Sequence, residues 1–144
     1  MFQFIRGLAL TGIVCLIAGC WTGPKEITYP ETGATLEGTV SYGKDKVGVG
    51  MVIAENSSGS ATGFVDDEGR FELKNVPLGE ISIGVNIDAG RGNAMGRLMS
   101  QTQGKAKSAP RVLDLPKKYQ NPATSGIKTT IVEGENHLDV VIPK

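Results

Sequence analysis

The sequence is poor in the residues that hold metal ions and in the excess charge that attracts nucleic acids. Its 144 residues include one His, two Cys and 6% aromatic residues. Most zinc and iron–sulfur sites need three or four Cys or His ligands, so we expect no metal and no cofactor. Lys and Arg number 15, as do Asp and Glu. This balance argues against a general nucleic-acid binder, which normally has a strongly basic face.

The N-terminal apolar run, residues 7–19, is too short to span a bilayer comfortably, since a transmembrane helix needs about 20 apolar residues. It follows a single cation, Arg6, and ends in small residues, which is typical of a secretory signal peptide over residues 1–19. The closing motif LIAGC resembles a bacterial lipobox. In a lipobox the cysteine, here Cys20, receives a diacylglyceryl group and the signal is cut just before it. An ordinary signal peptide or an uncleaved anchor is the alternative.

Few cysteines remain after such a cut. Cys15 lies in the discarded run, so Cys20 stands alone and cannot form an internal disulfide. Two or more acyl chains would anchor the protein stably. Residues 20–34 contain two Pro and two Gly, and we interpret them as a tether. We therefore expect a lipid-anchored protein of the bacterial cell envelope. Trp21 is not the Asp that often retains lipoproteins at an inner membrane, which favours the outer membrane.

Helical periodicity is also missing, and short alternating segments take its place. Leu36, Val40 and Tyr42 alternate with polar residues, as in a half-buried strand. Two further segments predict one buried face each, formed by Val47, Val49, Met51 and Ile53 and by Ile81, Ile83, Val85 and Ile87. With frequent Gly and Pro turns, the pattern predicts a seven-stranded antiparallel β-sandwich. The expected strands are 36–42, 47–53, 61–65, 70–74, 81–87, 127–131 and 138–142.

A hairpin turn is predicted at residues 66–69, Asp-Asp-Glu-Gly. Asp begins such turns and Gly69 accepts the positive φ before the second strand. An acidic turn of this kind lacks the alternating oxygen ligands of a calcium loop, so a hairpin explains it without a metal. Phe71 and Leu73 are then expected to point inward, and Arg70, Glu72 and Lys74 outward.

The stretch 63–79, GFVDDEGRFELKNVPLG, resembles the signature of carboxypeptidase-regulatory-like, transthyretin-like domains. Residues 36–40 are similar to the first strand of that family, and residues 116–126 to small bacterial lipoproteins with one such domain. The resemblance covers residues 35–144 and implies a Greek-key sandwich of the transthyretin (prealbumin) type. Such domains serve as accessory or binding modules.

Neither enzymatic activity found near this family carries over to the chain. Nothing resembles the zinc-binding His and Glu set of the peptidase domain that such modules accompany. Transthyretin-like hydrolases of purine breakdown use several His and Arg residues and a Tyr-Arg-Gly-Ser end, whereas this chain has one His and ends VVIPK. His137 and Asp139 share one expected strand face, but no glycine-framed nucleophile motif accompanies them. We therefore expect no enzyme.

The connection 89–125 is much longer than the usual few residues, and we expect an irregular loop there. Its part 89–118 holds seven cations against one anion, Asp114, a net charge of +6, while the rest of the chain after residue 19 sums to −7. Such a loop suits an anionic envelope component, for example lipid head groups or an acidic polymer. Alternatively, the segment is a solvated, partly disordered insert whose cations pair with the acidic body or simply keep it soluble. The candidate ligand-binding residues are Arg91, Arg97, Lys105, Lys107, Arg111, Lys117 and Lys118.

Together these features predict a membrane-anchored, non-catalytic binding or structural module. A second hypothesis is an accessory subunit that docks on another exported protein by adding to an exposed strand edge. A third is a hydrolase centred on His137.

Overall fold

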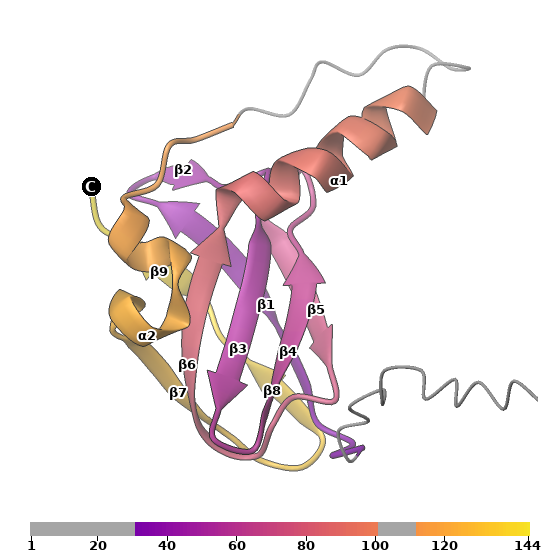
Figure 1. Cartoon of the computed structure of the whole chain (residues 1–144), viewed down its shortest axis with the longest axis vertical. Helices are drawn as coiled ribbons and strands as arrows, with labels where there is room; N and C mark the ends of the chain where they lie inside the picture. The colour runs from indigo at the N-terminus through magenta and orange to yellow at the C-terminus, as the bar shows by residue number, and fades with distance from the viewer. Residues whose placement is uncertain (1–30, 101–111) are drawn as a thin grey trace, which may run out of the picture.

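Two β-sheets share one hydrophobic core (Figure 1). The computed structural model describes residues 31–100 and 112–144. In the first sheet, β1 (Thr35–Tyr42) pairs with β2 (Asp45–Lys46), β5 (Arg70–Lys74), β8 (Glu135–His137) and β9 (Val140–Ile142). The second sheet has the order β4 (Gly59–Phe64), β3 (Met51–Asn56), β6 (Gly79–Asn86) and β7 (Ile127–Ile131). The expectation of a mainly β chain is confirmed.

The strand count and the pairing differ from the expectation. Nine strand segments occur in the described residues where seven were expected, because β2 and β8 are short and were not predicted. Most pairs are antiparallel, but β8 and β9 run parallel to β1, with Glu37 opposite His137 and Ser41 opposite Val141. Thr35 pairs with both Lys74 and Glu135, so β5 and β8 flank β1 on its two edges.

Alternation along the strands builds the core. On β5, Phe71 and Leu73 are buried and their neighbours are exposed, as predicted. The residues expected on one face of the next strand are likewise buried: Ile81, Ile83 and Val85 of β6, and Ile87, which is the first residue of the helix that follows.

The prediction for residues 47–53 was wrong in its phase. Val52 and Ala54 are buried, whereas Met51 and Ile53 are half-exposed on the outer face. Residues 47–50 are buried but lie outside any strand, so the alternation begins again at Met51. A period of two read across that break assigns the wrong face, because a shift of one residue reverses every side chain.

In its described parts, residues 89–100 and 112–125, the predicted irregular loop is largely helical, which corrects the expectation there. Helix α1 (Ile87–Ser100) follows β6 directly, and η1 (Lys117–Gln120) and α2 (Pro122–Ser125) precede β7. The side chain of Asn86 accepts a hydrogen bond from the N–H of Ala89 at 3.0 Å, as an N-cap residue does. Glycines at 90, 92 and 96 hid this helix, because Gly disfavours helix by about 1 kcal/mol each.

Close backbone contacts at two glycines determine where α1 and α2 pack on the sheet. A Cβ at Gly90 would lie 2.4 Å from backbone atoms of Gly50, so α1 crosses the entrance to β3 at backbone contact distance. A Cβ at Gly84 would lie 2.6 Å from the nitrogen of Pro122, so α2 lies flat on the outer face of β6. Among the described helices, none has the length and apolar character needed to cross a membrane.

Candidate ligand-binding hollows at the helical end

Two adjoining hollows lie between α1 and the segment 112–120. Both segments are at the end of the molecule away from the start of β1 (Figure 1). Arg91 and Asp114 line both hollows. The first has a volume of about 470 Å³ and the second of about 410 Å³. The first is otherwise lined by Val49, Ala94, Met95 and Val112, and the second by Ile87, Asp88, Leu115, Pro116, Lys117 and Gln120.

Packing against the core holds the walls of these hollows in place. Leu115 is buried in the core, and its carbonyl accepts a hydrogen bond from Nε2 of Gln120 at 3.0 Å. Ala94 faces the body from α1 and is buried, while Met95 beside it is 55% exposed. Val112, across from it, is 46% exposed. The larger hollow is therefore apolar and open to solvent.

Charges of both signs line the smaller hollow. Nε of Arg91 lies 3.7 Å from a carboxylate oxygen of Asp88, and both side chains are exposed. Within the described part of the chain, no hydrogen bond or ion pair joins the side chain of Asp114 or of Lys117 to another residue. Such a lining offers separate cationic and anionic groups to a ligand.

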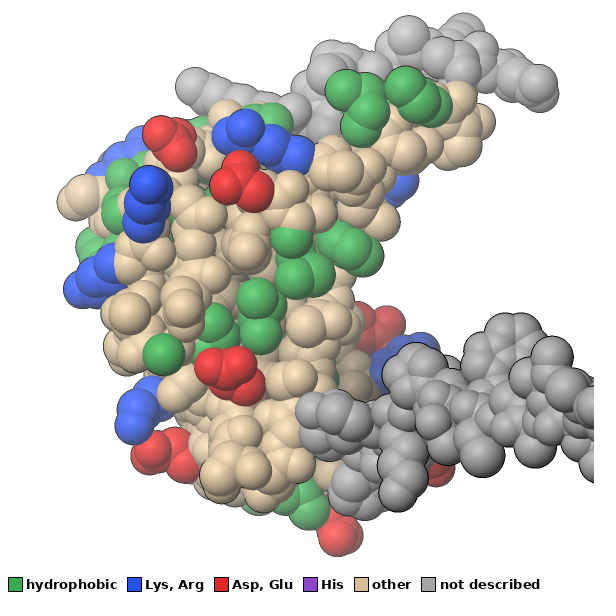
Figure 2. Space-filling view, viewed as in Figure 1, with side chains coloured by type: hydrophobic (Ala, Val, Ile, Leu, Met, Phe, Trp, Pro, Cys, Tyr) green, Lys and Arg blue, Asp and Glu red, His purple; other side chains and the backbone are tan. Residues whose placement is uncertain are grey.

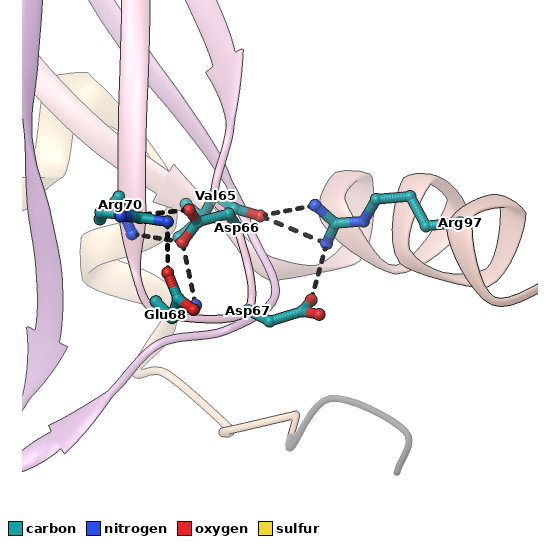
Figure 3. A network of polar contacts seen from close by, with 6 residues as sticks. All are labelled: Val65, Asp66, Asp67, Glu68, Arg70 and Arg97. Carbon is teal, nitrogen blue, oxygen red and sulfur yellow. Dashed lines mark hydrogen bonds and ion pairs between the residues drawn. The ribbon is translucent and has the colours of Figure 1, made fainter. Parts of the chain in front are cut away.

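Arg97, one of the predicted basic contacts, binds to the turn after β4 (Figure 3). Its guanidinium donates to the carbonyl of Val65 at 3.3 and 3.4 Å and lies 3.5 Å from Oδ1 of Asp67. Its side chain is only 34% exposed. This contact fits the alternative that cations of the segment pair with the acidic body, and it fixes α1 over the turn after β4.

The other predicted basic residues are distributed unevenly. Arg91 and Lys117 line the smaller hollow, while Lys118 follows Lys117 in η1 and has its Nζ 5.0 Å from the ring centre of Tyr119. Lys105, Lys107 and Arg111 lie outside the described residues, as do Cys20 and the predicted signal peptide. The sequence analysis did not identify the apolar residues of the larger hollow, or the acids Asp88 and Asp114, as parts of a site. They come from α1, from the entrance to β3 and from residues 112–114, and no local pattern in the sequence joins those segments.

The acidic turn at 66–69 is a hairpin turn, as predicted (Figure 3). Gly69 has φ +81°, and Oδ1 of Asp66 accepts the N–H groups of Glu68 and Arg70 at 2.9 and 2.8 Å. Desolvation acts to raise the pKa of Asp66, but the hydrogen bonds from Arg70 and Glu68 outweigh it and lower that pKa. The carboxylate of Asp66 therefore stabilises the turn. In the part of the chain described, no three or more His, Cys, Asp or Glu side chains are grouped so that they could hold a metal ion.

His137 and Asp139 lie on one exposed face, as the alternation indicated. Nε2 of His137 is 3.5 Å from Oδ2 of Asp139, while the hydroxyl of Thr39 donates to Oδ1 at 2.7 Å. This Thr39 bond is the main reason why the pKa of Asp139 is lowered. The carboxylate stands between the hydroxyl and the imidazole. In a hydrolytic triad the imidazole contacts the nucleophile instead.

Comparisons with known proteins find little. No family model and no curated protein matches the chain. Among solved structures, the Bacillus anthracis TIE protein is similar over 76% of this chain at 19% sequence identity, with a TM-score of 0.41. The similar region covers 16% of that protein's chain.

Proposed function

We propose that this protein is a lipid-anchored, non-catalytic component of the bacterial cell envelope, with the outer membrane favoured over the inner. Its body acts as a binding or structural module. The lipobox-like motif ending at Cys20 supports the anchor, and the resemblance of residues 63–79 to carboxypeptidase-regulatory-like domains supports the module. In this proposal, β2 and β8 are short additions to a seven-stranded Greek-key core.

The proposal rests on one observation, namely that the start of β1 and the basic helical segments lie at opposite ends of the sheets. The described chain enters at the foot of β1, whereas α1 and η1 lie at the other end of the sheets (Figure 1). The tether from Cys20 would reach roughly 40 Å when extended. An anchor at one end leaves the cations Arg91, Lys117 and Lys118 at the other, where they meet an anionic envelope component. Lys105, Lys107 and Arg111 belong to the same basic segment.

The test is co-sedimentation of residues 21–144 with purified envelope fractions at low and high salt. Every core residue in the described chain lies between Ala34 and Ile142, so this fragment keeps the whole core. Binding is expected to fall steeply with salt, since exposed charges are screened beyond about 10 Å at 0.1 M.

Charge variants locate the contact. Replacing Arg91, Lys117 and Lys118 by Gln is expected to weaken binding at least tenfold, since each cation near an anionic surface contributes about 1 kcal/mol. The matched control replaces Lys46, Lys74 and Lys128, three cations on the strands, and is expected to bind as before. Equal losses in both variants would contradict a localised contact.

Docking on another exported protein is the second candidate function. It is favoured by β7, which ends the four-stranded sheet and pairs with β6 alone in the described residues. An edge strand of this kind accepts an added strand through its free backbone groups. Binding that ignores salt and requires other envelope proteins would support docking in place of the anionic contact.

A further inference from the structure

The two hollows at the helical end separate apolar from charged side chains. In the larger hollow, polar groups occur only at its boundary with the smaller one, where Arg91 and Asp114 lie. A ligand group buried against its apolar wall must need no hydrogen bond, because burying an unpaired polar group is costly. An acyl chain meets this condition. An extended peptide does not, because each of its residues has a backbone donor and acceptor.

Two apolar side chains that line the larger hollow are exposed to solvent. Met95 is 55% exposed and Val112 is 46% exposed, and they face the larger hollow from two different segments. In the space-filling view, apolar side chains also appear along the exposed side of the helical end (Figure 2). An acyl chain lying between Met95 and Val112 would remove this surface from water, which is the main source of affinity in apolar sites.

The charged lining of the smaller hollow indicates the head group. It holds two cations, Arg91 and Lys117, and two anions, Asp88 and Asp114. Asp88 is already near Arg91, whereas Asp114 and Lys117 have no partner among the described residues. A purely anionic head group would lie beside two carboxylates. A head group with both a phosphate and an ammonium group complements both signs.

We propose that the paired hollow binds one zwitterionic lipid. The acyl chain lies on Val49, Ala94, Met95 and Val112. The ammonium group pairs with Asp114, and the phosphate with Lys117 and Arg91. This inference rests on the proposed function, because it assigns a ligand to the helical end of an envelope protein, and it identifies the anionic group that meets the cations as the phosphate of a lipid head group.

Calorimetric titration of residues 21–144 tests the proposal. The probes are a monoacyl phosphatidylethanolamine and a monoacyl phosphatidylglycerol with the same chain, both below their micelle-forming concentrations. We expect the ethanolamine lipid to bind one to one and at least tenfold more tightly. Free phosphoethanolamine, which lacks the chain, is expected to show no measurable binding.

Two variants with matched controls locate the ligand. Asp114→Asn is expected to bring the affinity ratio of the two lipids close to one, because it removes the partner of the ammonium group. Val112→Ser is expected to weaken both lipids about fivefold, since it removes apolar contact from the chain. The controls are Glu133→Gln, in the turn before β8, and Val141→Ser, an exposed valine on β9, and both are expected to bind like the unchanged protein.

Each contrary outcome has a distinct meaning. Equal or tighter binding of the glycerol lipid overturns the zwitterionic assignment but leaves an anionic contact in place. A short peptide that binds as tightly as the lipid makes the hollow a peptide site. Lipid binding that appears only after residues 101–111 are replaced by a Gly-Ser linker means that the chain fills its own hollow. Absence of lipid binding with salt-dependent envelope binding retained overturns this inference alone, and loss of both overturns the proposed function as well.

Discussion

The carboxylate of Asp66 connects the turn after β4 to the pH dependence of stability. It accepts two backbone N–H groups and the Nε–H of Arg70, so its ionised form is the one the fold stabilises. Because its pKa is lowered, this contribution is present above the ordinary value of 3.8 and is lost as the pH falls through the lower folded-state pKa. The side chain is 39% exposed, so solvent screening keeps the effect small.

We therefore expect Asp66→Asn to lower the free energy of unfolding at pH 7 by about 1 kcal/mol. The difference from the unchanged protein should shrink as the pH is lowered below about 4, where the native carboxylate also begins to lose its charge. Urea unfolding at a series of pH values measures this. Glu133→Gln, at an exposed turn position, is the control, and a difference that persists unchanged at low pH would contradict the linkage.

Helix α1 has three glycines with different roles. Gly90 permits contact with Gly50, whereas Gly92 and Gly96 have no atom within 4 Å of the place where a Cβ would stand. The last two therefore weaken the helix without serving its packing. Local sequence preference and tertiary contact disagree along this element, which explains why the helix escaped sequence-based prediction.

Substitution by alanine separates these roles. Gly92→Ala and Gly96→Ala are each expected to stabilise α1 by up to about 1 kcal/mol, seen as slower amide hydrogen exchange in residues 92–100. Gly90→Ala, by contrast, is expected to lower global stability by about 1–3 kcal/mol, because its Cβ would overlap the backbone of Gly50. Similar effects at positions 90 and 92 would contradict the close approach.

The contact of Arg97 with the turn after β4 acts on the outer half of the same helix. Arg97→Gln is expected to change the global free energy of unfolding by less than about 1 kcal/mol, because the pair with Asp67 is partly exposed. Amide exchange near the end of α1 should nevertheless become faster, because two hydrogen bonds to Val65 are lost. Asp67→Asn is the matched variant, since it keeps the Val65 bonds, and its effect on exchange should be smaller.

At the scale of the whole molecule, glycine allows the two sheets to join. A Cβ at Gly63 of β4 would lie 2.4 Å from the carbonyl oxygen of Glu72 on β5, in the opposite sheet. Gly63→Ala is expected to destabilise the fold by about 1–3 kcal/mol in thermal or urea unfolding. Gly92→Ala serves as the control that adds the same methyl group in open space, and an equally mild effect at Gly63 would contradict this account.

The sequence predicted what depends on neighbours along the chain. Alternation placed Phe71, Leu73 and Ile83 in the core, and the turn chemistry placed Gly69 at positive φ. Prediction from the sequence failed where the structure depends on contacts between segments that are far apart along the chain. The phase of β3 depends on the buried stretch 47–50, and the hollows need α1 beside residues 112–120. Arg97 was recognised as a cation, but its partner Asp67 lies thirty positions earlier in the chain.

The pairing of β1 with β8 and β9 has a consequence for the order in which the protein folds. Thr39 on β1 bonds Asp139, one hundred positions later. A chain that emerges from its N-terminus therefore holds β1 with one edge open until residues 135–142 have appeared. Until then, that edge has free backbone groups, which attract other unfolded chains. Completion of the first sheet is a late event, and the nascent protein is most prone to aggregate just before it.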